Sequence, residues 1–180
     1  MEALKGKIVL LTGGSRGVGP VIAEALVKKG STVVLAARSE SGLQEIASRL
    51  RKAGYRVNTA PADLRQSFER ERLIATVLKE LGRLDILINN AGLETEGAFA
   101  ELPWPAIEET IEVNLLAPME LTRLVLPEML KRKSGHIVNI ASVAAKSGAP
   151  YASDLFGKQG GIGRMGTRTS IDDDSWLVFV

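Results

Sequence analysis

The sequence predicts an α/β fold, in which a doubly wound parallel sheet lies between two layers of helices. Short runs rich in Val and Ile, each the length of a buried strand, recur along the chain, and stretches with helical spacing separate them. Regular alternation of this kind builds right-handed β-α-β units, so the strands should be parallel and covered on both faces. With 180 residues, 45% of them apolar and 24% charged, the chain suits one globular domain with a sizeable core.

The expected elements follow one another in a regular order. Strands are expected within 7–14 (KIVLLTGG) and at 33–37, 56–60, 85–89 and 136–142. Helical spacing covers 18–29, 41–53, 68–81 and 104–132, and Pro118 and Pro127 mark a bend in the last of these. After Ser153 glycines cluster and the apolar period stops. We therefore expect one domain over 1–153, a disordered coil tail over 154–180, and the later strands of the sheet to be missing.

Composition excludes several classes of partner. The net charge of +2 is spread along the chain, which argues against nucleic acid or a membrane surface as a partner. The chain has no cysteine and its single histidine, His136, begins an expected strand, so no metal site is expected. The first apolar stretch is too short for a signal peptide or a membrane span. A cytoplasmic location is the resulting expectation.

The stretch TGGSRGVG at 12–19 carries the first chemical signal. It follows an expected strand and opens an expected helix. Glycine suits a turn in which the backbone takes positive φ or lies against a ligand, and the helix N-terminus offers unpaired N–H groups to a pyrophosphate. The pattern favours a cofactor site over a merely structural turn.

Three further motifs follow this turn along the chain. They are NNAG at 89–92, Asn114, and Ser142 after HIVNIA. In this order and at this spacing the motifs resemble those of short-chain dehydrogenases/reductases, from Lys5 to about Ser153. The resemblance implies a Rossmann-type sheet, a nicotinamide cofactor, a small-molecule carbonyl or alcohol substrate, and a catalytic set of Asn, Ser, Tyr and Lys. Members are usually homo-oligomers, but the interface helices would be absent here.

The resemblance also implies roles for individual residues. Cofactor contacts are implied at Gly13, Ser15, Arg16, Gly17, Val18, Gly19, Arg38, Asp63, Leu64, Asn89, Ala91 and Gly92. Of these, the NNAG residues would flank the adenosine ribose and Asp63 would touch adenine. Asn114 would hold a bound water of the proton relay, and Ser142 would hydrogen-bond the substrate carbonyl. Three structural alternatives stay open: a helix N-cap for Asp63, a buried helix-break asparagine for Asn114, and a strand-end cap for Ser142.

Charge near the second expected strand predicts the form of the cofactor. An NAD-preferring site places a carboxylate about 20 residues beyond the glycines, whereas an arginine there meets the 2′-phosphate of NADP. The second strand here ends AARS, with Arg38 and no carboxylate, and Arg16 lies inside the glycine turn. Two guanidinium groups suit a dianionic phosphate, so NADP(H) is favoured over two ordinary surface arginines.

The family pattern breaks after Ser153. Its tyrosine follows the serine by about thirteen residues and its lysine follows four later, but these positions are Leu155 and Gln159. Tyr151 and Lys158 are the nearest substitutes, at the wrong spacing. Residues 155–162 can be encoded so that reading one base further on gives Y-S-A-S-K-A-G-L, the family signature. We therefore expect a frameshift, an accidental G-x-G-x-x-G at 161–166, and lost catalysis; a non-catalytic nucleotide-binding sensor or scaffold is the alternative.

Overall fold

The computed structural model describes residues 4–95, 98–141 and 177–179. Its strands are β1 (Ile8–Thr12), β2 (Thr32–Ala37), β3 (Val57–Pro61), β4 (Ile86–Asn89), β5 (His136–Asn139) and β6 (Leu177–Phe179). Its α-helices are α1 (Gly19–Lys28), α2 (Glu40–Lys52), α3 (Ser67–Leu81), α4 (Trp104–Ile111) and α5 (Ala117–Lys131), with a 3-10 turn at Phe99–Glu101 and a π-helical turn at Glu112–Leu116. The predicted alternation is confirmed.

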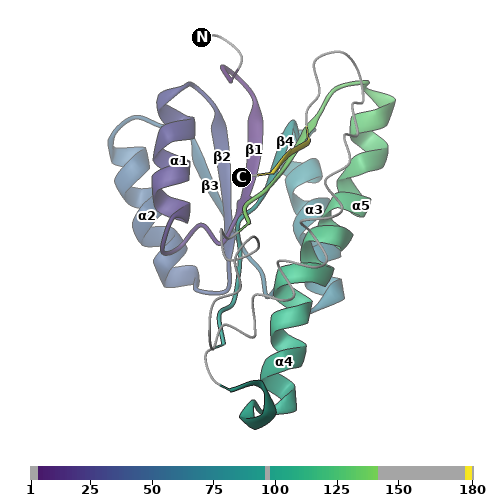
Figure 1. Cartoon of the computed structure of the whole chain (residues 1–180). Coiled ribbons are helices and arrows are strands. Elements are labelled where there is room, and N and C mark those ends of the chain that lie inside the picture. The colour runs from purple at the N-terminus through teal and green to yellow at the C-terminus, as the bar shows by residue number, and fades with distance from the viewer. Residues whose placement is uncertain (1–3, 96–97, 142–176, 180) are drawn as a thin grey trace.

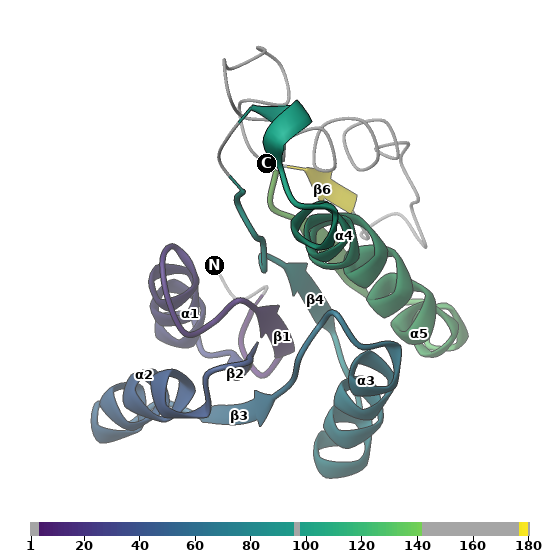
Figure 2. The same ribbon diagram turned by 90° about the horizontal axis from the view of Figure 1, so that it is seen from below.

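The strands form one parallel sheet in the order β3-β2-β1-β4-β5-β6. From β1 the chain winds outward through β2 and β3, then returns to the other side of β1 as β4 and β5. Helices α1 and α2 cover one face, and α3 and α5 cover the other (Figure 1). Figure 2, a view from below, shows the same layers around β1 and β4. The predicted doubly wound, three-layer α/β/α class is therefore confirmed.

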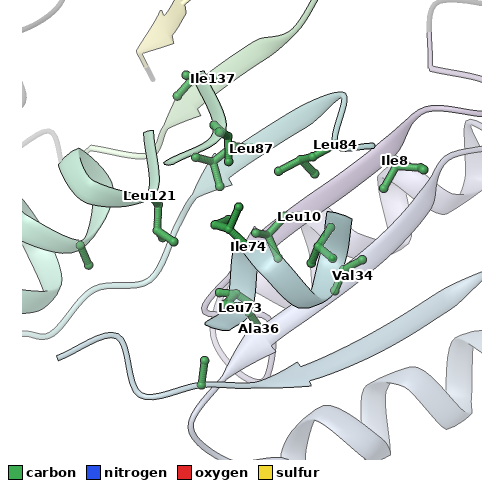
Figure 3. Close-up of a cluster of buried hydrophobic side chains, with 14 of the residues drawn as sticks. Ile8, Leu10, Val34, Ala36, Leu73, Ile74, Leu84, Leu87, Leu121 and Ile137 are labelled. Carbon is green, nitrogen blue, oxygen red and sulfur yellow. The ribbon is translucent and has the colours of Figure 1, made fainter. Parts of the chain in front are cut away.

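Side-chain alternation along the buried strands divides the core in two. Leu10 and Leu87 point toward α3 and α5, where they join the cluster of Figure 3 with Leu73 and Leu121. Leu11, one residue on from Leu10, belongs to the cluster beneath α1 and α2. Because both faces of these strands are buried, their sequences are continuously apolar rather than alternating.

The expected coil tail over 154–180 needs one correction. The last three described residues, Leu177–Phe179, pair in parallel with β5 at the edge of the sheet, so coil does not extend through all of that range. An unpaired strand edge is a template for another extended segment, which explains why an apolar stretch can add to it. The other residues of the expected tail, 154–176 and 180, lie outside the described residues.

The break in the 104–132 helix also differs from expectation. It is a π-helical turn at Glu112–Leu116, before Pro118 rather than at the two prolines. Pro118 lies in the first turn of α5, a position that proline often takes, and Pro127 lies inside α5.

Candidate functional site

The turn between β1 and α1 has the geometry that its glycines predict. Gly13 and Gly17 both have positive φ, 67° and 60°. A Cβ on Gly13 would come within 2.8 Å of the Ala91 Cα, whereas a Cβ on Gly17 would meet no atom within 4 Å. Gly19 packs so closely on the Gly13 carbonyl that no side chain fits there. Two of the three glycines thus serve close packing, and Gly17 leaves open space beside the turn.

The helix that follows this turn begins without a side-chain cap. Val18 is the N-cap of α1, no side chain accepts from its first turn, and the first turn has no acidic residue. The Gly19 and Val21 N–H groups donate to the carbonyls of Arg16, at 3.3 Å, and Val18, at 3.1 Å, and Pro20 has no N–H. What this N-terminus offers an anion is therefore the positive end of the helix dipole.

A hydrogen-bond network that the sequence did not predict joins this turn to the loop after β4. The Thr12 hydroxyl donates to the Ile88 carbonyl at 3.3 Å and accepts from the backbone N–H groups of Asn90 and Ala91, each at 3.0 Å. The Asn90 amide donates to the carbonyls of Thr12 at 2.9 Å and Gly13 at 3.3 Å. The consecutive asparagines after a buried strand were the available signal. The network fixes two loops that come from distant parts of the sequence.

A groove runs along the carboxyl ends of β1, β2, β3 and β4. It lies where the strand order reverses on either side of β1, the position at which open parallel sheets bind ligands. Its lining contains eight residues predicted from the sequence, Gly13, Ser15, Arg16, Arg38, Asp63, Leu64, Ala91 and Gly92, together with the unpredicted Ala37, Ser39, Ala62, Leu93 and Val113. Four of the predicted residues do not line the groove: Gly17, Val18, Gly19 and Asn89. The first three directly follow the lining residue Arg16 in the sequence.

The groove contains two exposed arginines. Arg16 and Arg38 both line it. Within the described ranges, neither takes part in an ion pair. Beside them, the Ser39 hydroxyl caps α2 by accepting from the Gly42 N–H at 3.1 Å. The groove therefore presents two guanidinium groups that form no ion pair among the described residues.

Asp63 is held by a neighbouring arginine. Its carboxylate accepts the Arg65 backbone N–H at 3.1 Å, and Arg65 Nη2 at 2.6 Å. These bonds from Arg65 hold the pKa of Asp63 below its usual value, against burial. The proposed helix-cap alternative is wrong, since the N-cap of α3 is Gln66. Any contact with adenine would be shared with this guanidinium.

Asn89 lies below the groove rather than on it. It is the last residue of β4, is 6% exposed, and donates from Nδ2 to Asn139 Oδ1 at 2.8 Å across to β5. Its own Oδ1 is buried and finds no partner among the described residues. The position supports the loop that follows, so the resemblance-based contact with the ribose stays a prediction.

Asn114 sits in the π-helical turn and is 2% exposed. Its Oδ1 accepts from the Leu93 N–H and its Nδ2 donates to the Leu93 carbonyl, both at 2.9 Å. Both ends of the side-chain amide thus hold the loop that follows Gly92, which favours the structural alternative for that side chain. In an α-helix the Asn114 carbonyl would accept from residue 118, which is a proline without an N–H. This carbonyl is therefore a candidate acceptor for the predicted water.

The remaining predicted positions cannot be compared with the structure. Ser142, Tyr151, Leu155, Lys158 and Gln159 lie outside the described residues, as does the glycine pattern at 161–166. The proton-transfer half of the predicted site falls on that part of the chain.

One buried arginine supports the groove from behind. Arg70, 4% exposed, donates to the Leu64 carbonyl at 2.5 Å and to Glu120 at 2.5 Å, and it meets Glu112 at 3.2 Å. Ser67 and Arg70 hold the pKa of Glu120 below its usual value, against burial. The sequence signal was an arginine within the apolar stripe of α3, three residues before Leu73. Arg70 ties the groove wall at Leu64 to α5 and the π-helical turn.

Among the described residues, no group of three or more His, Cys, Asp or Glu side chains could hold a metal ion. None of the helices in that part of the chain is long and apolar enough to cross a membrane.

A parallel sheet with a glycine-rich first turn and a groove at its switch point defines the class of dinucleotide-binding α/β proteins. Within that class, the chain belongs to the short-chain dehydrogenase family, whose model matches residues 7–154. The family predicted from the sequence motifs is confirmed.

Relatives with known names cover most of this chain. Ketoacyl reductase HetN of Nostoc sp. is 44% identical over 162 residues, which are 90% of this chain and 56% of that protein. A putative ketoacyl reductase of Streptomyces coelicolor is 38% identical over 166 residues, 89% of this chain and 64% of the relative. The chain therefore spans roughly 56–64% of the length of these curated relatives.

Solved structures agree with this assignment. A metagenomic short-chain oxidoreductase in complex with NADP matches with a TM-score of 0.86 and 35% identity over 90% of this chain and 74% of that one. A variant of actinorhodin polyketide ketoreductase with NADPH matches with a TM-score of 0.85 and 36% identity over 92% of this chain and 64% of that one.

Proposed function

We propose that the protein is an NADP(H)-dependent oxidoreductase of the short-chain family that acts on a carbonyl or alcohol group. The observation that carries the proposal is the groove at the carboxyl ends of the strands, which holds two arginines, without an ion pair in the described part of the chain, beside an uncapped helix N-terminus.

The described residues fit the cofactor. The open space beside Gly17 and the N-terminus of α1 suit a pyrophosphate, because the backbone can approach it and the helix dipole favours its charge. Arg16 and Arg38 suit the 2′-phosphate, which only the phosphorylated form carries. Two of the solved relatives were crystallised with NADP or NADPH.

The names of the relatives narrow the substrate. Two relatives are ketoacyl reductases and one solved neighbour is a polyketide ketoreductase, so the ketone of an acyl chain is the substrate class to test first. When bound, the nicotinamide ring supplies or accepts the hydride. Ser142 would hydrogen-bond the substrate oxygen, and the Asn114 main chain would hold a water near it. A small-molecule substrate is part of this proposal. Members of the family are usually homo-oligomers, but the interface helices would be absent here.

A second candidate function rests on Leu155 and Gln159. The family places a tyrosine and a lysine at this spacing, because the ammonium group lowers the pKa of the phenol that transfers the proton. Leucine carries no proton and glutamine no charge. A protein that binds the dinucleotide without turnover, as a sensor or scaffold, is therefore the competing proposal.

Binding and turnover, measured side by side on the purified chain, separate the two. We expect NADPH to quench or shift protein fluorescence at lower concentration than NADH, and NADPH oxidation with ketoacyl substrates to be about 10²- to 10⁴-fold below a related enzyme. Failure to bind NADPH would refute both candidates. Turnover at the rate of a related enzyme would assign the proton to Tyr151 with Lys158, or to another group, and would refute the sensor proposal. Genomic DNA across codons 150–165 would test the frameshift directly.

A further inference from the structure

The groove places one carboxylate close to the arginines that the proposed function assigns to the 2′-phosphate. Asp63, Arg16 and Arg38 all line it. Arg38 is near enough to Asp63 to help lower the pKa of that carboxyl, after the larger effects of Arg65. A guanidinium binds a carboxylate and a phosphate in the same two-pronged way. Without another ion-pair partner, the Asp63 carboxylate would therefore compete with the 2′-phosphate for Arg38.

In this structure the partner of the Asp63 carboxylate is Arg65. The Asp63 carboxylate accepts from the Arg65 backbone N–H at 3.1 Å, from Nε at 3.0 Å to each oxygen, and from Nη2 at 2.6 Å. An ionised carboxylate offers about four lone-pair positions, and these three N–H groups of Arg65 bond to both of its oxygens. Arg38 makes no ion pair in the described part of the chain, although Asp63 shares its groove.

The position of Arg65 is itself fixed from a second element. Its Nη1 donates to Glu109 Oε1 at 2.6 Å, and Glu109 lies on α4. The side chains of Arg65 and Asp63 are only 30% and 25% exposed. Because Glu109 already restricts the Arg65 side chain, less conformational entropy is lost when its guanidinium also binds Asp63. The ion pair with Asp63 is therefore favoured.

We propose that Arg65 is a positioning residue that sets the preference for NADP(H) over NAD(H), because it holds Asp63 in its own ion pair and leaves Arg38 available to the 2′-phosphate. The inference rests on the proposed cofactor. It concerns a residue that does not itself line the groove and that acts only through Asp63.

A double-mutant cycle on the 180-residue chain tests the inference, with dissociation constants for NADP⁺ and NAD⁺ measured by calorimetric or fluorescence titration. R65M should weaken NADP⁺ binding about two- to fivefold and NAD⁺ binding less than twofold, since partly exposed ion pairs are worth up to about that factor. The NADP⁺ loss should shrink in high salt. In a D63N background, R65M should change NADP⁺ affinity less than twofold, because no carboxylate is left to capture Arg38.

Two control variants complete the cycle. R65K keeps the charge and should recover part of the NADP⁺ affinity. E109Q should change it less than twofold, because the glutamine oxygen can still accept from Arg65 Nη1 and the bonds to Asp63 remain. Equal losses for both cofactors in R65M, or the same loss with and without D63N, would overturn the inference alone. An unmutated chain that binds NAD⁺ as tightly as NADP⁺ would overturn the proposed cofactor preference and the inference with it.

Discussion

Alanine at two glycines of the same turn should separate folding from cofactor binding. Gly13 and Gly17 both have positive φ, so either substitution incurs the left-handed penalty of about 1–2 kcal/mol. Only at Gly13 does the new methyl also meet backbone, at 2.8 Å from the Ala91 Cα and 3.0 Å from its N. That backbone cannot shift easily, because the Ala91 N–H is bonded to the Thr12 hydroxyl.

The two effects at Gly13 add. Overpacking of a fixed contact costs about 1–3 kcal/mol, so we expect G13A to lower the free energy of unfolding by about 2–5 kcal/mol and G17A by about 1–2 kcal/mol. For a domain of this size each kcal/mol shifts Tm by about 2–4 °C. At Gly17 the methyl enters open space where the pyrophosphate is proposed, so G17A should weaken NADPH binding more than tenfold.

Thermal melts followed by circular dichroism, together with NADPH titrations of the variants that remain folded, provide the assay. The two substitutions are matched controls for each other, since they add the same methyl group at similar φ. Equal losses of Tm in both variants would refute the contact argument at Gly13. Unchanged NADPH affinity in G17A would refute the placement of the pyrophosphate.

Three further predictions follow from named contacts. R38D should shift binding preference from NADPH toward NADH, as a ratio of dissociation constants that moves at least tenfold, because a phosphate partner is replaced by a ribose acceptor. D85N should lower the free energy of unfolding by about 2–4 kcal/mol in urea titrations. The reason is that Asp85 accepts from the Ile8 N–H at 2.8 Å, from Arg83 at 3.0 Å and from Arg132 at 3.1 Å. E24Q removes an exposed pair with Lys28 and is the control, whose stability should be unchanged. Burial raises the pKa of Asp85, but the Ile8 N–H and the guanidinium groups outweigh burial and lower that pKa. The contribution of Asp85 to the free energy of unfolding should therefore be complete above about pH 4 and should fall as pH drops through the lowered pKa. Melts between pH 2 and 7 that show the same acid loss for D85N and the unmutated chain would contradict the last of these.

The sequence was a good guide where local chemistry decides structure. Positive φ at Gly13 and Gly17 follows from the turn that TGGSRGVG must make, and the structure has it. The sequence also explains why Arg38, Asp63 and Gly92 line one groove. Each residue comes just after a strand, and the carboxyl ends of parallel strands lie at one edge of the sheet.

Sequence reasoning was weak where a partner lies far along the chain or depends on turn geometry. Arg132 and Asp85 are separated by 47 residues, and no periodicity links them. The pairing of Arg65 with Asp63 at a spacing of two depends on the turn before α3, which propensity does not specify. The π-helical turn likewise came before Pro118 rather than at it, since the missing N–H disturbs the turn that would have bonded to it.

The described structure divides the family's chemistry into two parts that can be tested separately. Every residue assigned here to the 2′-phosphate and pyrophosphate lies in the confirmed alternation of strands and helices, and Thr12 and Asn90 hold those loops together. The proton donor and its cation depend instead on positions 155 and 159, where the sequence has Leu155 and Gln159. Nucleotide affinity depends on charge and backbone approach in the first part, whereas turnover needs an acidic proton from the second. Affinity for NADPH should therefore survive any change after Ser153 that leaves the fold intact, while turnover should depend on residues 155 and 159.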